Sequence, residues 1–263
     1  MQWTYLPSMT IGGQQVVTAS RSELTEALIS DCHAFRRNDR PFGPRLVFDI
    51  NGHGLSLSKT DASYRSALAS ADIIHADGGF LVTLSKRLNP TPITERSATT
   101  DLIHDFALRA REEGIRFFLL GGSEAVNAAC ARNLEEIYPG LSIAGRHHGY
   151  FSHEDADAVI DLINHSGADV VFVGLGKPNE QLFSVKNAHR IRSGWLVTCG
   201  GCFNYVAGEY DRAPEWMQRN NIEWLHRMAT KPKQFFWRYL TTTPHALWIV
   251  ATEAMKQRRE QKT

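Results

Sequence analysis

Short apolar segments alternate along the chain with longer segments in which apolar residues recur every three or four positions. This alternation predicts buried strands separated by amphipathic helices. The predicted strands span residues 45–50, 72–76, 115–120, 141–144, 169–174 and 195–198. Because strands that alternate with helices usually pair in parallel, the pattern predicts an α/β fold, a mostly parallel sheet with helices on both faces.

Local signals give the expected ends of several elements. Ser20 and Glu23 form a capping box at the start of the first predicted helix. Residues 51–54 are predicted to form a loop after the first strand of the series. Thr60 is the expected cap of the next helix, which should run to residue 70.

Polar or glycine-rich segments directly follow five of the predicted strands. They are Asn51, Asp77 and the glycines of residues 121–122, 174–176 and 200–201. In open α/β sheets, ligands bind beyond the carboxyl ends of the strands. The sequence therefore predicts one binding site at this edge of the sheet.

The glycine-rich segments can hold phosphate, because each precedes a helix whose first N–H groups and dipole attract anions. The segments at residues 121–123 and 174–178 match neither a Walker loop nor a dinucleotide fingerprint. Each of them, taken alone, also fits a tight turn. Their common position favours a nucleotide diphosphate. The expected contacts are Gly121, Gly122, Ser123, Gly174, Gly176, Lys177 and Gly201.

Three further side chains near this edge can act on a sugar substrate. Asp77 precedes two glycines that leave space beside it, so its carboxylate can accept a proton from a sugar hydroxyl; the alternative is a helix cap or turn aspartate. Asn51 can bond a sugar or be an ordinary turn residue. Arg96 can neutralise phosphate or pair with an acidic neighbour, Glu95 or Asp101.

Neither a metal site nor another cofactor is expected. The one D-x-D match, Asp155 to Asp157, lies at a helix start, where acidic residues are expected for the dipole. His147 and His148, expected in a loop, lack a partner at metal-ligand spacing. The C-G-G-C sequence at 199–202 favours close packing over redox or zinc chemistry, since no second pair accompanies it.

Charge divides the chain unevenly. Residues 211–263 carry ten lysines and arginines against five acidic residues, whereas the preceding 210 residues carry nineteen against twenty-three. We therefore expect a core of residues 1–208 and a basic, aromatic appendage of residues 209–263 that meets an anionic partner. A membrane surface, a diphosphate and nucleic acid all fit this charge.

The appendage is expected to begin with a helix through Arg227, with Pro214 in its first turn. Aromatic residues at 235–240 then suit a helix that lies in a membrane interface; the alternative is a terminal helix packed on the core. No apolar run approaches the length of about 20 residues that spans a bilayer, and the start lacks a signal-peptide pattern. These features predict a cytosolic protein.

Several blocks resemble the WecG/TagA/CpsF glycosyltransferases, family 26 of the carbohydrate classification. The blocks are HADGG at 75–79, ERSATTDL at 95–102, FLLGGSE at 118–124, HGYF at 148–151, VGLGKPNEQ at 173–181 and RAPEWMQRNNIEWLHR at 212–227. The resemblance covers about residues 45–240. It implies an inverting, metal-independent enzyme with a Rossmann-like core and a membrane-docking C-terminal appendage.

The resemblance also implies substrates and roles. A hexose-type sugar would pass from a UDP-sugar to a polyprenyl-diphosphate-linked saccharide at the cytoplasmic face of the membrane, with no nucleic-acid partner; the oligomeric state stays open. Asp77 matches the family's proposed general base, and Asn51 and Arg96 match substrate contacts. The expected phosphate and membrane contacts of the appendage are Arg212, Arg219, Arg227, Lys233 and Arg238.

The chain departs from the family pattern at residues 179–181. The family sequence P-K-Q-E is here Pro178, Asn179, Glu180 and Gln181, so acid and amide are exchanged. Either Glu180 or Gln181 could contact substrate, and Glu180 could compete with Asp77 as base.

The donor sugar is open. Residues 51–57 look closer to the exopolysaccharide branch, with its xanthan-type β-1,4-glucosyltransferase, which favours UDP-glucose over UDP-N-acetylmannosamine. Rival functions are a nicotinamide-dependent oxidoreductase and a non-catalytic membrane-binding scaffold.

Overall fold

A computed structural model describes residues 4–38, 43–152, 154–220 and 222–260 of the chain. Six parallel strands form its central sheet, in the spatial order β4-β3-β8-β7-β5-β6. The strands are β3 (Arg45–Ile50), β4 (Ile73–Ala76), β5 (Arg116–Gly121), β6 (Ser142–His147), β7 (Val170–Gly174) and β8 (Trp195–Thr198). The predicted α/β, Rossmann-like fold is confirmed.

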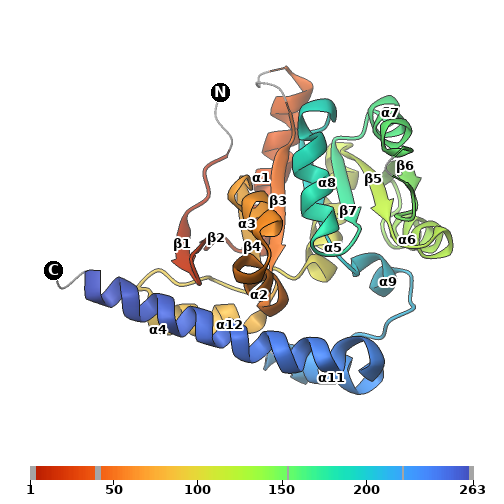
Figure 1. Cartoon of the computed structure of the whole chain (residues 1–263). Coiled ribbons are helices and arrows are strands. Elements are labelled where there is room, and N and C mark those ends of the chain that lie inside the picture. The colour runs from red at the N-terminus through yellow and green to blue at the C-terminus, as the bar shows by residue number, and fades with distance from the viewer. Residues whose placement is uncertain (1–3, 39–42, 153, 221, 261–263) are drawn as a thin grey trace.

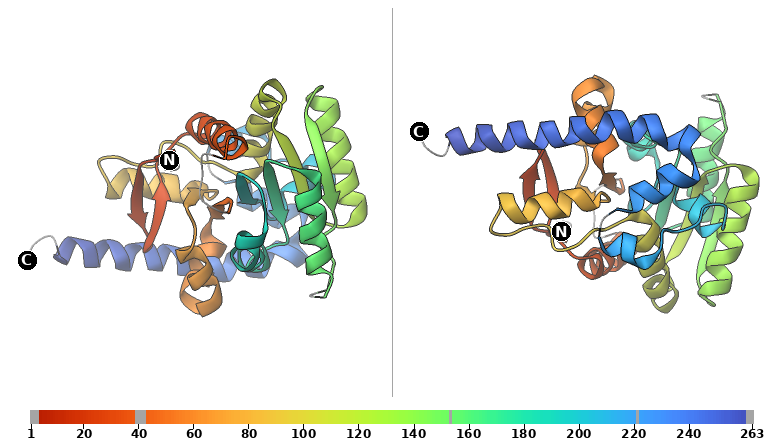
Figure 2. Two further views of the ribbon diagram at one scale, coloured as in Figure 1. Left: turned by 90° about the horizontal axis from the view of Figure 1, so that it is seen from above. Right: turned by 90° about the horizontal axis from the view of Figure 1, so that it is seen from below.

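Helices cover both faces of this sheet (Figures 1 and 2). One face packs against α1 (Arg21–Arg36), α5 (Thr99–Glu113), α6 (Glu124–Ile137) and α9 (Cys202–Val206). The other packs against α2 (Gly52–Thr60), α3 (Ala62–Ala69), α4 (Gly79–Leu88), α7 (Ala156–Ser166) and α8 (Asn179–Asn187). A small hairpin of β1 (Ser8–Ile11) and β2 (Gln14–Val17) joins this second face, and a short 3₁₀ turn, Ala188–Arg190, follows α8.

Alternation of side chains along the strands divides the core between the two faces. In β5, Phe117 and Leu119 enter one hydrophobic cluster, whereas Phe118 and Leu120 enter the other. All four are fully buried, and burial of each such side chain contributes about 1.5–3 kcal/mol. Because both faces of the parallel sheet are covered, its inner strands are largely apolar, as in β7, where Val170, Val171, Phe172 and Val173 are all buried.

The C-terminal segment crosses the carboxyl ends of the strands (Figure 1). It contains α10 (Glu215–Arg219), α11 (Glu223–Thr230) and the long helix α12 (Pro232–Glu260). Ala246, Ile249 and Val250 of α12 are buried, and Ser56 of α2 bonds His245 at 2.9 Å. One side of α12 therefore packs on the core. The opposite side exposes Phe236, Trp237, Leu240, Leu247, Trp248 and Met255. Packing on the core is therefore confirmed, whereas the membrane-interface interpretation stays a prediction.

Several helices begin or end at other residues than predicted, and local hydrogen bonds lie at these positions. Residues 52–54 begin α2 rather than a loop, because the Asn51 side chain caps the helix by accepting from Gly54 N–H. Asp61, not Thr60, caps α3. The expected helix through Arg227 is two helices, and the Asn220 side-chain amide donates to the Trp216 carbonyl where the first of them ends.

Cys199 and Cys202 are buried free thiols, and burial raises both pKa values. Their position confirms the packing interpretation of the C-G-G-C sequence. His147 ends β6 instead of lying in a loop. The division of the chain at residues 208 and 209 stays a prediction.

Candidate functional site

The carboxyl ends of the strands open onto three adjoining cavities. Neighbouring strands β5 and β7 lead to α6 and α8 on opposite faces of the sheet, and such a divergence leaves a crevice at the sheet edge. We name the three parts the Asp77 cavity, the connecting cavity and the glycine-loop cleft. Arg227 and Arg238 line all three parts, so the cavities form one continuous site.

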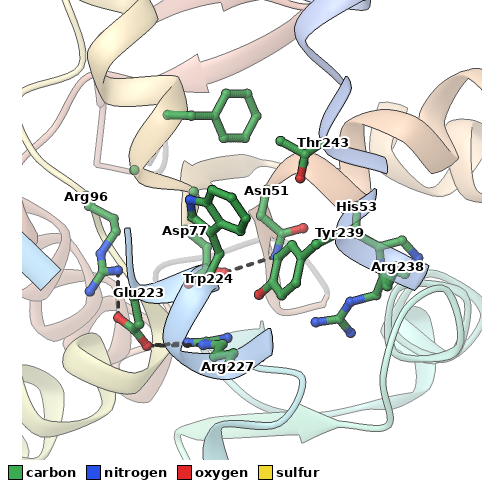
Figure 3. A pocket seen from close by; sticks show the side chains of 14 residues that line it. Asn51, His53, Asp77, Arg96, Glu223, Trp224, Arg227, Arg238, Tyr239 and Thr243 are labelled. Carbon is green, nitrogen blue, oxygen red and sulfur yellow. Dashed lines mark hydrogen bonds and ion pairs between the residues drawn. The ribbon is translucent and has the colours of Figure 1, made fainter. Parts of the chain in front are cut away.

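Asp77 lies at the end of β4 and lines both the Asp77 cavity and the connecting cavity. Its backbone N–H bonds the Ile50 carbonyl at 2.9 Å, and its carboxylate accepts from the Asn51 side-chain amide at 3.0 Å (Figure 3). The cap residue of α4 is Gly78, not Asp77. The aspartate therefore faces the site, as the sequence predicted.

The charges around Asp77 favour its ionised form. Burial opposes ionisation, but Arg227, the Asn51 hydrogen bond, Lys177 and Arg96 outweigh it and hold the pKa of Asp77 below its usual value. The side chain is consequently a carboxylate at neutral pH. A carboxylate in a cavity can accept a proton from a hydroxyl that reaches it.

Two arginines approach the Asp77 cavity on either side of Glu223. Arg96 Nη1 donates to Glu223 at 2.9 Å, and Arg227 Nη2 donates to the other carboxylate oxygen at 2.7 Å (Figure 3). Arg96 also pairs with Asp101 at 3.3 Å, so it both lines the cavity and has an acidic partner. Sequence reasoning did not assign Glu223; its signal is an acid four residues before Arg227.

The glycine-loop cleft has a volume of about 520 Å³. Gly122, Ser123, Gly174, Gly176 and Gly201 line it, as predicted. Ser123 also caps α6 by accepting from Val126 N–H at 3.2 Å. The cleft is wide enough for a ligand of nucleotide size.

Gly121 has a different function from the expected phosphate contact. It lines none of the three cavities. At this residue, with φ of 141°, an added Cβ would lie 2.3 Å from the Gly174 carbonyl oxygen. Gly121 is therefore required by the close approach of β5 and β7.

A buried carboxylate uses the N–H groups of two glycine segments. Glu180 accepts from Gly176 N–H and Gly200 N–H, each at 3.0 Å. Burial, the largest influence, raises the pKa of Glu180 to about 7, and Lys177 opposes this shift. Because one Glu180 oxygen already holds both N–H groups, these donors are not directed at a phosphate.

Lys177 lines the connecting cavity whereas Gln181 does not, and both have partners inside the protein. The Lys177 ammonium is bonded to Asp49 and lies 3.6 Å from Glu180, so its charge is matched inside the protein. Gln181 is fully buried, donates to Glu180 and Thr198, and lines none of the three cavities. The exchanged acid and amide thus form an internal network in the wall of the connecting cavity.

The cations of the appendage divide into two groups. Arg227 lies over the Tyr205 ring, 4.9 Å from its centroid, and Arg238 lies 4.6 Å from the centroid of Phe235; both face the site. Arg212 instead bonds Asp101 at 2.8 Å, and Lys233 is exposed on α12. Neither of these two lines the three cavities, and the Arg219 side chain lies outside the described residues.

An aromatic wall, which sequence reasoning did not assign, completes the Asp77 cavity. It consists of Phe80, Trp224 and Tyr239, with Thr243 beside them. His53 also lines this cavity; burial, with Arg238 and Lys177, lowers its pKa to about 4, so the imidazole is neutral. The sequence signal for Trp224 and Tyr239 is the aromatic content of the appendage, and Phe80 has no such signal.

The D-x-D residues lie apart from the site. Asp155 accepts a hydrogen bond from Ser152 at 2.7 Å, and Asp157 pairs with Arg190 at 2.7 Å. Both aspartates lie at the start of α7, as predicted.

Comparison with known proteins identifies the family of the chain. The sequence model of the glycosyl transferase WecG/TagA/CpsF family matches residues 9–260. An N-acetylglucosaminyldiphosphoundecaprenol N-acetyl-beta-D-mannosaminyltransferase of Bacillus spizizenii is 34% identical over 181 residues, which cover 69% of this chain and 68% of the relative. A protein of the same name from Bacillus subtilis is 30% identical over 198 residues, 75% of each chain. The chain belongs to the WecG/TagA/CpsF family of glycosyltransferases.

Proposed function

We propose that the protein transfers a hexose-type sugar from a UDP-sugar to a polyprenyl-diphosphate-linked saccharide. The observation that carries this proposal is the ionised Asp77 carboxylate, fixed by Asn51, in a cavity that also contains Arg96 and Arg227. Such a site supplies a base for a hydroxyl and positive charge for a diphosphate. A non-catalytic scaffold protein would need neither the base nor the positive charge. The dinucleotide fingerprint of a nicotinamide enzyme is absent from the sequence.

The reaction we propose is a single displacement. The acceptor hydroxyl oxygen forms a bond to the anomeric carbon while the bond from that carbon to the diphosphate oxygen breaks. Asp77 takes the hydroxyl proton, and UDP leaves with the electron pair of the broken bond. Attack opposite the leaving group inverts the anomeric centre.

The positive charge for UDP departure comes from the appendage in this proposal. Arg227 and Arg238 line the glycine-loop cleft, the connecting cavity and the Asp77 cavity, so a diphosphate between the cleft and Asp77 would pass both. Preorganised cations directed at a developing negative charge are a strong source of catalysis. The mechanism as proposed assigns this task to arginines without a metal ion.

Two donors are candidates. The name that both relatives carry favours N-acetylmannosamine and an undecaprenyl-diphosphate-linked N-acetylglucosamine acceptor. The sequence of residues 51–57 favours glucose and the exopolysaccharide branch. We propose UDP-N-acetylmannosamine as the leading donor and UDP-glucose as its competitor.

We further propose that the appendage docks on the inner face of the cell membrane. Within the described residues, none of the helices has the length and apolar composition that a bilayer crossing requires. The exposed side of α12 carries aromatic and aliphatic residues, and such a face can enter a membrane interface beside basic residues. Docking there would place the site beside a lipid-linked acceptor.

A donor and acceptor panel tests this function. The full chain is incubated with UDP-N-acetylmannosamine or UDP-glucose and a short-chain lipid-diphosphate-linked N-acetylglucosamine, and products are read by mass spectrometry. Calorimetry measures binding of UDP, UMP and NAD. We expect UDP binding and one sugar added to the acceptor with EDTA present; NAD binding without transfer would contradict the proposal.

A further inference from the structure

The aromatic wall belongs to only one part of the site. Phe80, Trp224 and Tyr239 line the Asp77 cavity but neither the connecting cavity nor the glycine-loop cleft. The three residues come from α4, α11 and α12. Asp77 lines both the Asp77 cavity, which holds the aromatic wall, and the connecting cavity, which Gly176, Gly200 and Gly201 line.

This arrangement separates two binding regions. If UDP occupies the glycine-loop cleft, the donor sugar lies toward the connecting cavity and its anomeric carbon toward Asp77. The acceptor hydroxyl must reach the same carboxylate from the side that the donor leaves open. That side is the Asp77 cavity, which Asn51, Asp77 and the aromatic wall line.

The chemistry of the wall suits a sugar ring. Trp224 and Tyr239 have ring centroids 6.0 Å apart at 51°, and Trp224 keeps 37% of its surface exposed. A pyranose presents C–H groups on one face and hydroxyls at its rim. The aromatic face can pack against the C–H groups, and the nearby Asn51, Asp77 and His53 side chains can bond the hydroxyls. Ligand sites commonly combine apolar and polar groups in this way.

We propose that Phe80, Trp224 and Tyr239 form the subsite for the terminal sugar of the acceptor, with Trp224 stacked on the apolar face of its ring. This inference rests on the proposed transferase function and adds to it the residues that select the acceptor. Trp224 is a substrate-binding residue in this proposal, whereas Asp77 performs the proton transfer.

The position of α12 connects this subsite to the outer surface. Tyr239 and Thr243 of α12 line the Asp77 cavity, while Trp237, Leu240 and Trp248 of the same helix are exposed. A helix with its side chains is about 10–12 Å across. A sugar at the aromatic wall would thus lie within about one helix diameter of the apolar surface, within reach of a diphosphate attached to a membrane lipid.

Substitution of Trp224 in the full chain tests the subsite. With a farnesyl-diphosphate-linked N-acetylglucosamine acceptor, we expect Trp224→Ala to raise the acceptor KM about tenfold and to leave the donor KM and UDP affinity within twofold of the wild type. Trp224→Phe keeps an aromatic face and should recover most of the acceptor affinity. Because Trp224 is partly exposed, its truncation should leave the fold intact.

Trp216 provides the matched control. It is a tryptophan of the same appendage, is 59% exposed, and lines none of the three cavities. We expect Trp216→Ala to leave both KM values unchanged.

Two results would overturn the subsite while the transferase function stands. One is an acceptor KM unchanged in Trp224→Ala, and the other is an equal rise of donor and acceptor KM, which would indicate a displaced appendage. A wild-type protein that binds UDP but transfers neither sugar to this acceptor would overturn the proposed function and the subsite together.

Discussion

Glu223 of the appendage accepts a hydrogen bond from Arg96 of the core at 2.9 Å, although the two residues are 127 positions apart in the chain. The same carboxylate bonds Arg227 at 2.7 Å and is 5% exposed. The arginines raise the stability of its ionised form enough to lower the pKa of Glu223 despite burial. One buried acid thus fixes the orientation of two cations in the Asp77 cavity and ties the appendage to the core.

Removal of this carboxylate should affect both stability and activity. We expect Glu223→Ala to lower the free energy of unfolding by about 3 kcal/mol, since it removes the carboxylate that pairs with the largely buried Arg227 and leaves Arg96 with Asp101 alone. Turnover should fall with it because Arg96 and Arg227 lose their fixed positions. Glu223→Gln keeps an acceptor and should lose less of both.

Denaturant unfolding and steady-state kinetics measure these effects. Glu215→Ala, at an exposed acid of α10, is the control. A Glu223→Ala protein with wild-type stability and turnover would show that the pairing does not organise the site.

Asp77→Asn should keep the fold and lose about 10²–10⁴-fold in kcat, the usual contribution of a general base. The amide is close in size to the carboxylate and can still contact Asn51, so UDP affinity should be preserved. Kinetics and calorimetry on the same preparation separate these two effects. Near-normal turnover would remove Asp77 from the proposed role.

Glu180→Ala should weaken donor binding indirectly. The cause would be loss of the carboxylate that holds the glycine segments, not loss of a contact with the substrate. The Glu180 carboxylate holds Gly176 and Gly200, so we expect the donor KM to rise about tenfold and kcat to change less. Hydrogen exchange should become faster at both glycine N–H groups. Glu180 is in this view a positioning residue.

Ser184→Ala is the control for Glu180. The Ser184 side chain is buried on the same helix and donates to the Glu180 backbone carbonyl at 2.7 Å, so its loss perturbs α8 without freeing the glycines. If Glu180→Ala and Ser184→Ala had the same hydrogen-exchange rates at the two glycine N–H groups and the same donor KM, Glu180 would not be a positioning residue.

Acid should destabilise the protein partly through His53. Its pKa is about 4 in the folded state and about 6.5 when unfolded, so between these values the unfolded chain binds more protons. Stability therefore rises with pH across this window and is lost as pH falls through it. Because the side chain is partly exposed, we expect its share to be on the order of 1 kcal/mol at pH 5.

Unfolding at pH 7.5 and pH 5 checks the His53 prediction. The loss of stability between the two pH values should be smaller in His53→Asn than in the wild type by about this amount. An identical loss in both proteins would exclude His53 as a contributor.

The exposed side of α12 should determine membrane binding. We expect replacement of Trp237, Leu240 and Trp248 by glutamine to lower binding to phosphatidylglycerol vesicles at least tenfold, because burial of each side chain contributes about 1.5–3 kcal/mol. UDP affinity should not change. Leu162→Gln on α7, 44% exposed and outside the appendage, is the control; equal vesicle binding by all three proteins would disprove docking through this surface.

Much of the core could be read from local sequence. The strands were predictable because a sheet covered on both faces favours runs of apolar residues, as in β7, where the four residues from Val170 to Val173 are buried. Asp77 was predictable because a polar residue that follows such a strand and precedes glycines must lie at the sheet edge. The helix starts at Gly52 and Ala62 were missed because single side-chain hydrogen bonds from Asn51 and Asp61 decide them.

The sequence by itself determined the parallel sheet, the edge at which the site lies and the charge of the appendage, since each follows from periodicity or composition. Only the tertiary structure decided which cations reach Asp77, that Glu180 holds glycine N–H groups, and that Trp224 and Tyr239 line a cavity. These outcomes depend on side chains from distant segments that meet in a partly buried space. In that space, the cost of removing a charged group from water and the attraction of a specific partner together decide where each charged side chain lies. No local pattern in the chain specifies that partner.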